Sequence, residues 1–262
     1  MAKTFSTKDF GVIQEQYSFF ETHSTEAAAD VAAYDGVLRD LWSEKPRASS
    51  LRMLDFGCGP GGFTARFLQQ LNFPREMLAL SLVEPVDVYR ETAIRQLSAY
   101  AVEEVHATAT LPDVAEGRFD LILSNHVLYY VPALEDTVAG LLSKLSPGGV
   151  FLTSLAGSDN TLIQLWQASF EMLGKRVPYN IREDLERVFA AIGVTPSRQK
   201  VHYTLEFADT DANRESLLRF LLSDYFEQLP RQTLLDLLNP FATAEGKVSM
   251  RMQHDQFCCQ QP

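Results

Sequence analysis

The chain has 262 residues, of which 46% are hydrophobic and 22% charged. This length suits one large α/β domain or at most two small ones, and the composition is typical of a folded globular protein. The formal net charge of −11 argues against a nucleic acid partner, because a polyanion needs a basic surface.

The sequence also argues against export or membrane insertion. The first ten residues lack the apolar core of a signal peptide, and no apolar run reaches the length of a membrane span. Three cysteines, Cys58 and the adjacent Cys258 and Cys259, do not make a disulfide framework. We therefore expect a cytoplasmic protein with reduced cysteines and no membrane partner.

Helical and strand patterns alternate through the first 157 residues. Residues 8–44 are expected to be helical and 45–50 to be a linker. Strands are then predicted at 51–56, 79–84, 102–108, 119–124 and 150–155, with helices from about 61, at 86–100 and at 132–145 and a turn at 146–149. This alternation predicts a parallel, doubly wound sheet with right-handed crossovers.

The pattern changes after residue 157. Helices are expected at 160–173, 181–192 and 212–222, and residues 200–207 and 248–258 are predicted to form a closing antiparallel pair. We interpret the chain as one domain, with a helical cap at 1–45, a cofactor-binding core at 51–157, and a substrate lid with closing strands at 158–262.

The most informative motif is the glycine turn after the first strand, Asp55-Phe56-Gly57-Cys58-Gly59-Pro60-Gly61-Gly62. Glycines at 57, 59 and 62 allow positive φ and a close approach of a ligand to the backbone. Such a turn fits several nucleotide-like ligands, including NAD and FAD, and also some ordinary turns.

Two acidic residues at strand ends distinguish between these ligands. A carboxylate at Asp55 would repel a dinucleotide pyrophosphate but would attract the ammonium and sulfonium groups of S-adenosylmethionine. Glu84 ends the second strand 25 residues after Gly59, where a carboxylate can accept both ribose hydroxyls of an adenosine. The residues therefore predict S-adenosylmethionine as the cofactor and S-adenosylhomocysteine as its product. An NAD-dependent oxidoreductase is a disfavoured alternative.

The run from Ser124 to Tyr130 leaves the fourth strand beside the expected cofactor. His126, Tyr129 and Tyr130 could line a substrate pocket, in which aromatic faces attract a cation. They could equally be a hydrogen-bonded structural histidine and loop-packing tyrosines. The histidines show no metal-ligand spacing, so no metal site is expected: His23, His106, His126, His202 and His254.

Landmarks from about residue 10 to residue 258 resemble histamine N-methyltransferase and its relatives. They are Tyr17-Ser18-Phe19-Phe20, His23-Ser24-Thr25-Glu26, Val83-Glu84-Pro85, Val127-Leu128-Tyr129-Tyr130-Val131, Gly157-Ser158 before Leu165-Trp166, and Glu245-Gly246-Lys247-Val248. The resemblance implies a class I methyltransferase fold, Rossmann-like and mostly parallel with a closing antiparallel hairpin and helical lid elements.

The resemblance also assigns site residues. Together with the residue-level reasoning, it gives cofactor contacts at Asp55, Gly57, Gly59, Gly61, Glu84, Pro85, Tyr89, Thr110, Leu111 and Asn125. The implied substrate-binding residues are Tyr17, Phe20, Glu26, His126, Tyr129, Tyr130, Trp166, Phe220 and Met252. Glu26 would orient the substrate, and His126 would position it or take its proton. A helix-start acid favoured by the helix dipole is the alternative for Glu26.

Four positions depart from the family pattern. Tyr89 and Asn125 differ in residue type, Met252 replaces a substrate-binding Asn, and His126 replaces a Gln. Histamine itself therefore does not follow as the substrate. We expect methyl transfer to a small, cationic or imidazole-containing molecule by a monomer or weak homodimer. Transfer to an oxygen, carboxylate or sulfur acceptor, or a non-catalytic cofactor-binding role, remains open.

Overall fold

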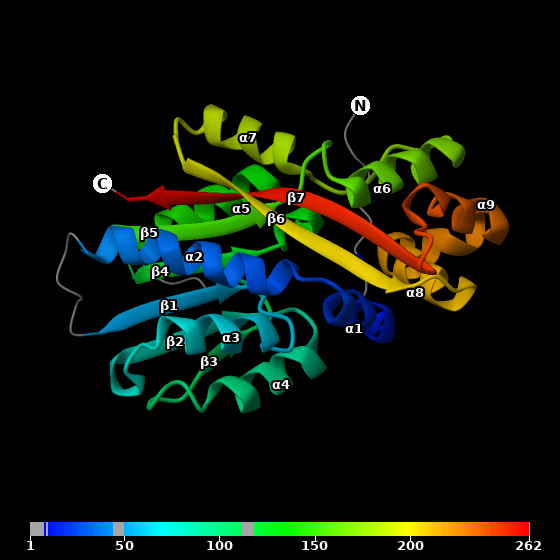
Figure 1. Cartoon of the computed structure of the whole chain (residues 1–262). Coiled ribbons are helices and arrows are strands. Elements are labelled where there is room, and N and C mark those ends of the chain that lie inside the picture. The colour runs from blue at the N-terminus through cyan, green and yellow to red at the C-terminus, as the bar shows by residue number, and fades with distance from the viewer. Residues whose placement is uncertain (1–7, 9, 44–49, 112–117, 262) are drawn as a thin grey trace.

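A seven-stranded sheet with the order β3-β2-β1-β4-β5-β7-β6 organises the protein (Figure 1). The computed structural model describes residues 8, 10–43, 50–111 and 118–261. The strands are β1 (Leu51–Phe56), β2 (Leu78–Val83), β3 (His106–Thr108), β4 (Phe119–Asn125), β5 (Leu145–Leu155), β6 (Ser197–Ala208) and β7 (Lys247–Gln260). β1 to β5 pair in parallel, while β7 pairs antiparallel with β5 and β6. The predicted α/β sheet with a closing antiparallel hairpin is confirmed.

Nine α-helices lie in the described part of the chain. They are α1 (Gln14–His23), α2 (Glu26–Ser43), α3 (Gly62–Leu71), α4 (Asp87–Leu97), α5 (Leu134–Ser143), α6 (Thr161–Met172), α7 (Arg182–Ala191), α8 (Asp211–Leu222) and α9 (Arg231–Asp236). Short 3-10 helices span Arg75–Met77, Leu128–Tyr130, Ser223–Gln228 and Asn239–Phe241.

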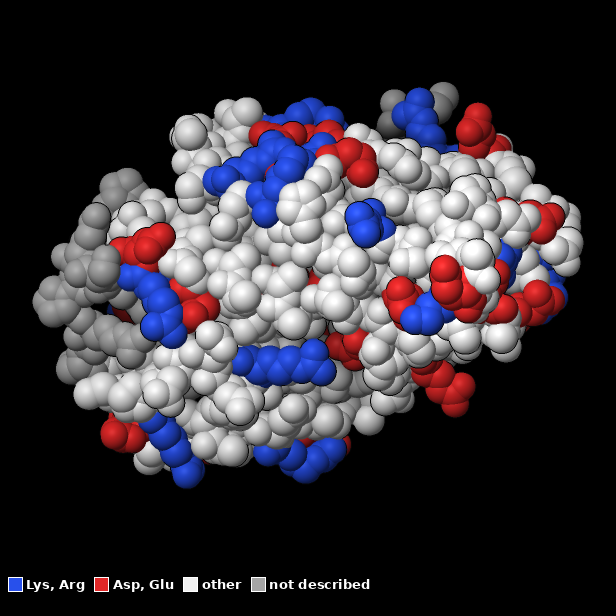
Figure 2. Space-filling view, in the orientation of Figure 1, with Lys and Arg blue, Asp and Glu red and all other residues white. Residues whose placement is uncertain are grey.

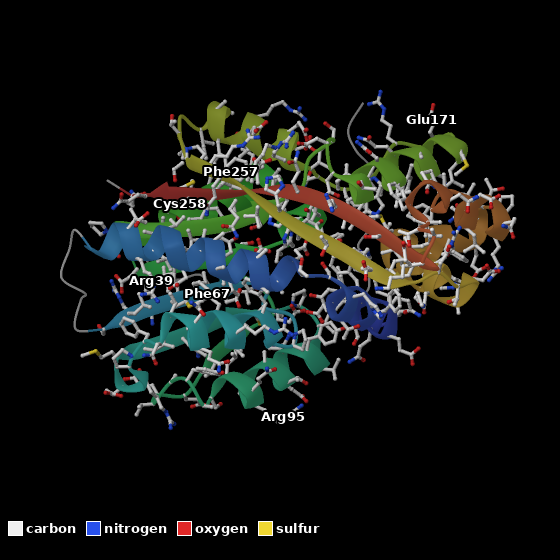
Figure 3. The ribbon with its side chains drawn as sticks, viewed as in Figure 1. Arg39, Phe67, Arg95, Glu171, Phe257 and Cys258 are labelled. Carbon is white, nitrogen blue, oxygen red and sulfur yellow. The ribbon has the colours of Figure 1, made fainter. Side chains whose placement is uncertain are left out.

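Each face of the sheet carries its own apolar core, because successive strand residues point to opposite faces. Leu121 and Leu123 of β4 join the core covered by α2, α3 and α4, whereas Ile122 joins the core covered by α5 to α8. Phe67 of α3 is fully buried against Tyr34 of α2, with their ring centroids 6.1 Å apart (Figure 3). Helices therefore cover both faces, as a doubly wound sheet requires.

Three expected element boundaries are wrong. The helical region 8–44 is interrupted at Ser24, which forms a β-bridge with Leu205 of β6 and so divides α1 from α2. The third strand covers only His106–Thr108, because the residues before it do not pair with β2. The expected turn at 146–149 lies inside β5, whose pairing with β4 is irregular near Phe119. Most of the expected linker, residues 44–49, lies outside the described residues.

The surface in Figure 2 mixes both charge signs, with Lys and Arg beside Asp and Glu rather than gathered into one basic area on this face. One such group joins α7 to β6 and β7: the fully buried Asp255 carboxylate pairs with Arg182 at 2.8 Å and with Arg198 at 2.6 Å. Within the described residues, none of the helices is both long enough and apolar enough to cross a bilayer.

Candidate active site

The glycine turn at the end of β1 adopts a conformation that requires glycine. Gly57, Gly59 and Gly61 have φ values of +80°, +55° and +91°. A Cβ atom at Gly57 would lie 2.4 Å from Cγ1 of Val127, whereas one at Gly59 would meet nothing within 4 Å. Gly62 is the first residue of α3 rather than part of the turn, contrary to expectation. The backbone at Gly59 therefore faces open space that a ligand can approach.

Two carboxylates flank this turn. Glu84, directly after β2, accepts hydrogen bonds from the backbone N–H groups of Gly59 and Val86, each at 2.9 Å. Burial raises the pKa of Glu84. Asp55 is 3% exposed and accepts a hydrogen bond from the Thr64 hydroxyl. Burial raises the pKa of Asp55 to about 7. The open glycine backbone between two carboxylates fits the ribose and the positively charged end of S-adenosylmethionine.

The other expected cofactor residues lie around this edge of the sheet. Pro85 is exposed beside Glu84, while Thr110 and Leu111 follow β3. The Tyr89 hydroxyl donates to the Phe10 carbonyl at 2.7 Å, and so ties α4 to the N-terminal segment. Cofactor contacts at these positions stay predictions.

A polar cluster lies at the end of β4. His126 directly follows this strand and has a φ of +57°, which is uncommon for a non-glycine residue and is often found at functional sites. Its Nε2 lies 3.0 Å from Oδ2 of Asp30 and 3.6 Å from Oε1 of Glu26, and its Nδ1 lies 3.3 Å from the Tyr129 hydroxyl. Glu26 begins α2, where its backbone N–H donates to the Ser24 hydroxyl at 3.1 Å.

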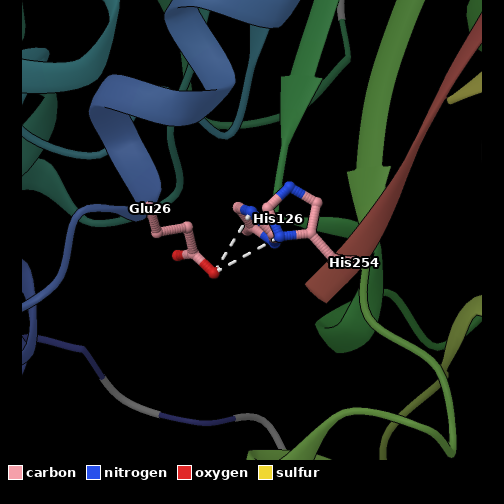
Figure 4. A group of neighbouring side chains, drawn as sticks. All are labelled: Glu26, His126 and His254. Carbon is pink, nitrogen blue, oxygen red and sulfur yellow. Dashed lines mark ion pairs between the residues drawn. The ribbon is translucent and has the colours of Figure 1, made fainter. Parts of the chain in front are cut away.

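His254 of β7 completes this cluster, as Figure 4 shows. Its Nδ1 lies 3.7 Å from Oε1 of Glu26, and its Nε2 lies 2.6 Å from Oδ1 of Asp30. Gln256 also donates to Oδ1 of Asp30 at 2.8 Å, and Asn125 donates to Oδ2 at 3.2 Å. The sequence predicted Asn125 as a cofactor contact, and the structure places its side-chain amide against Asp30.

Sequence reasoning missed Asp30 and His254 as site residues. Asp30 lies four residues after Glu26, so helical spacing could have placed both carboxylates on one face of α2. His254 carried no such signal, because only the pairing of β7 with β5 and β6 brings it to α2.

The cluster combines two carboxylates, Glu26 and Asp30, with two imidazoles, His126 and His254. Burial opposes ionisation of Asp30, but the neighbouring His254 and His126 hold the pKa of Asp30 well below its usual range. Burial likewise opposes the charged form of His126, but Glu26 and Asp30 outweigh this effect and raise the pKa of His126 to about 9. His126 is therefore mainly protonated at neutral pH and lies between the carboxylates of Asp30 and Glu26, which are also the groups in this cluster that could pair with a cationic ligand.

Aromatic rings extend from this cluster toward α1 and α8. Phe20 stacks on Phe220 with centroids 4.8 Å apart, and Tyr17 lies 5.9 Å from Phe220. Tyr129 stacks with His126 at 6.1 Å and meets the Trp166 ring at 5.8 Å. The structure therefore brings these predicted substrate residues into one region.

The two remaining predicted substrate residues border the same region. The Tyr130 ring lies 5.7 Å from the Tyr129 ring. Met252 is 4% exposed and pairs with Tyr203 across β6 and β7, two residues before His254 and hence on the same face of the sheet.

Lys8 is a further residue that sequence reasoning missed. It is 8% exposed, and its ammonium nitrogen lies 4.3 Å from the Phe220 ring centroid, 5.3 Å from that of Phe10 and 5.6 Å from that of Tyr130. The ammonium also donates to the Phe220 carbonyl, and burial lowers the pKa of Lys8 to about 7. No motif marks this residue. The aromatic region thus already surrounds an amine of the chain itself, which carries a positive charge when protonated.

Comparison with known proteins agrees with the fold. The YcgJ protein from Bacillus subtilis has a TM-score of 0.56 at 16% identity, over 87% of this chain and 97% of that one. The malonyl-acyl-carrier protein O-methyltransferase of Enterobacter lignolyticus is 33% identical over 130 residues, which are 49% of each chain. Methyltransferase calH of Penicillium decumbens is 32% identical over 121 residues, 43% of this chain and 33% of that one. The chain thus spans half or less of these two curated relatives.

A family model described as a methyltransferase domain matches residues 26–197. This match covers the glycine turn, Glu84, His126 and the acidic residues of α2. It agrees with the predicted cofactor and enzyme class. The chain therefore belongs to the methyltransferase-domain family, the class I enzymes that use S-adenosylmethionine as methyl donor.

Proposed function

We propose that this protein methylates a nitrogen atom of a small cationic molecule, such as an amine, an imidazole or an amino-acid derivative. The observation that carries the proposal is the carboxylate cluster of Glu26 and Asp30 around His126, beside aromatic rings that already surround the Lys8 amine. A cationic acceptor would find both a carboxylate partner and aromatic faces in this region. The resemblance to histamine N-methyltransferase points to the same class of acceptor.

The cofactor would be held by the glycine turn, Asp55 and Glu84, and it supplies an electrophilic methyl group. The chain's own residues would then align the acceptor and exclude water. Trp166, Tyr129 and Phe20 are all buried and suited to that role.

A protonated amine must lose a proton before its nitrogen can attack. His126 has a raised pKa of about 9 and is therefore mainly protonated at neutral pH. An imidazole that already carries its proton cannot accept the proton of the amine. We assign proton acceptance and ammonium binding to Glu26, and we assign to His126 the positioning of the Glu26 carboxylate at 3.6 Å. The sequence left open whether His126 takes the proton of the substrate, and we propose that it does not.

Methylation of a carboxylate oxygen is a second candidate. The Enterobacter lignolyticus relative is named an O-methyltransferase. In addition, Lys8 and His126, when protonated, could pair with an anionic acceptor. In that case Glu26 would repel the acceptor rather than bind it. The two candidates therefore predict opposite effects of neutralising Glu26.

The test is a methyl-transfer assay with labelled S-adenosylmethionine and a panel of amines, imidazoles, amino acids and carboxylic acids. For a cationic acceptor, Glu26→Gln should lower kcat/KM by about 100-fold, which corresponds to about 2.7 kcal/mol. The exposed Glu171 of α6 provides a matched control, because Glu171→Gln removes the same charge on a different element. Binding of S-adenosylhomocysteine should be unchanged in both variants.

Methylation of carboxylic acids alone, with Glu26→Gln equal to or faster than wild type, would refute the amine proposal and favour the second candidate. Binding of S-adenosylhomocysteine without methylation of any acceptor would favour a non-catalytic cofactor-binding role.

A further inference from the structure

One nitrogen atom in the site has an unusual environment. His254 is fully buried, and its Nδ1 has no hydrogen-bond partner among the described residues. A buried polar atom without a hydrogen-bond partner destabilises the folded state and is uncommon in proteins. This nitrogen points toward Glu26 and His126, as Figure 4 shows.

We propose that Glu26, His126 and His254 form a binding site for a divalent transition-metal ion of borderline softness, with Zn²⁺ as the representative ion. Two imidazole nitrogens and one carboxylate are ligands that Zn²⁺ and its neighbours accept. Spacing along the sequence predicted no such site, because His126 directly follows β4 and His254 lies in β7, and only the folded sheet, with β5 between these two strands, brings them together.

Two of the three distances between the ligand atoms are close to those around one bound ion. Oε1 of Glu26 lies 3.6 Å from Nε2 of His126 and 3.7 Å from Nδ1 of His254, and all three atoms lie within 4.8 Å of one another. A tetrahedral ion with bonds of about 2.1 Å separates its ligand atoms by about 3.4 Å. The two contacts to Glu26 therefore need to shorten by only a few tenths of an ångström, and the two imidazole nitrogens, which lie within 4.8 Å of each other, need to approach to about the same separation.

The hydrogen bond to Asp30 sets the tautomer of His254. Nε2 lies 2.6 Å from the Asp30 carboxylate, so it carries the proton and leaves the lone pair of the neutral ring on Nδ1. A carboxylate that orients a ligating histidine through its other nitrogen is the usual arrangement around protein-bound metal ions. Asp30 would serve as this positioning residue.

Both carboxylate oxygens of Asp30 would keep at least one hydrogen-bond donor when a metal ion binds. The ion would displace the proton on Nε2 of His126, which would remove one hydrogen bond from Oδ2 of Asp30. Oδ2 would still accept from Asn125, and Oδ1 would still accept from Gln256 and His254. Ion binding would therefore leave no buried carboxylate oxygen without a donor.

Three protein ligands leave a tetrahedral ion one further position, for water or another ligand. If the proposed function holds, Glu26 would serve both the metal ion and the cationic acceptor, and the two would compete for it. This consequence alone rests on the proposed function. The ion would then act as an inhibitor competitive with the acceptor.

The experiment is equilibrium dialysis of the chelator-treated full chain against Zn²⁺, with S-adenosylhomocysteine present and no methyl acceptor. We expect one Zn²⁺ per chain. Glu26→Gln and His254→Ala should each weaken binding by about 100-fold or more, and Asp30→Asn should weaken it by about 10–100-fold. The exposed His202 of β6 supplies a matched control, since His202→Ala should bind as the wild type does.

His254→Ala could lose Zn²⁺ binding simply because a core residue is removed. Glu26 is partly exposed, so Zn²⁺ binding by Glu26→Gln is the result that decides whether the proposal holds. Retained affinity for S-adenosylhomocysteine would show that each variant is folded. Zn²⁺ binding that is weaker than about 100 μM in the wild type, or equal in the wild type and Glu26→Gln, would overturn the proposal. Site-specific Zn²⁺ binding without methylation of any amine would refute only the proposed function.

Discussion

The sharpest test of the cofactor-binding turn is the substitution Gly59→Ala. A Cβ at this position would meet no protein atom within 4 Å, so the added methyl group causes no internal clash. The φ of +55° still disfavours alanine, because the left-handed conformation costs about 1–2 kcal/mol. We therefore expect a modest loss of stability and an intact fold.

The effect on the cofactor should be larger. If the ligand lies against the Gly59 backbone, the methyl group occupies the space into which the ligand must come. We expect the Kd of S-adenosylhomocysteine to rise by about 10–100-fold, which corresponds to about 1.4–2.8 kcal/mol. The hydrogen bond from the Gly59 N–H to Glu84 is retained, since alanine keeps that donor.

The assay is calorimetric titration with S-adenosylhomocysteine, combined with urea unfolding. Gly246→Ala is the matched control, because Gly246 has a φ of +72°, has open space at its Cβ position and lies just before β7. Both variants should lose similar stability, but only Gly59→Ala should lose affinity. Equal Kd values in the two variants would refute the assignment of this turn as the cofactor cradle.

Two further predictions concern Asp55 and Lys8. The pKa of Asp55 is raised from 3.8 to about 7 in the folded protein, so the folded state holds this proton more tightly and stability should fall as pH rises from about 4 to 7. Asp55→Asn should flatten this slope in urea unfolding of the cofactor-free protein, and an unchanged slope would contradict the burial argument. Lys8→Met removes the ammonium beside Phe220, so it should lower KM for a cationic acceptor and raise KM for a carboxylate. An unchanged KM for every acceptor would show that Lys8 does not contribute to acceptor binding.

The glycine turn and the position of Glu84 beside it could be predicted from the sequence because their signals are local. Gly57, Gly59 and Glu84 lie where an apolar strand ends, and a parallel sheet brings such ends to one edge. Tyr89 was harder to predict. Its hydroxyl donates to the Phe10 carbonyl, and that pairing depends on where the N-terminal segment packs rather than on any pattern around α4.

The acceptor half could be predicted only in part. Glu26 was expected from the resemblance and His126 from its place after the fourth strand, but their shared partner Asp30 and the fourth member His254 were not expected. His254 reaches the cluster through the register of β7, in which Val201 of β6 faces it. A one-residue shift of that register would turn the imidazole to the opposite face of the sheet. Such a placement is a property of the assembled sheet and leaves no local trace in the sequence.

The cost of burying Asp30 argues that this cluster is retained for more than stability. Asp30 is fully buried and accepts hydrogen bonds from Asn125 of β4 and Gln256 of β7, so it joins α2 to two strands. Well-packed apolar residues usually join elements as well as, or better than, a buried ionic group does. The polar solution here also fixes the His254 tautomer and holds His126 beside Glu26. A buried carboxylate that orients two imidazoles toward the partly exposed Glu26 carboxylate gains nothing for packing, but under the proposals above it would preorganise a site for a cation.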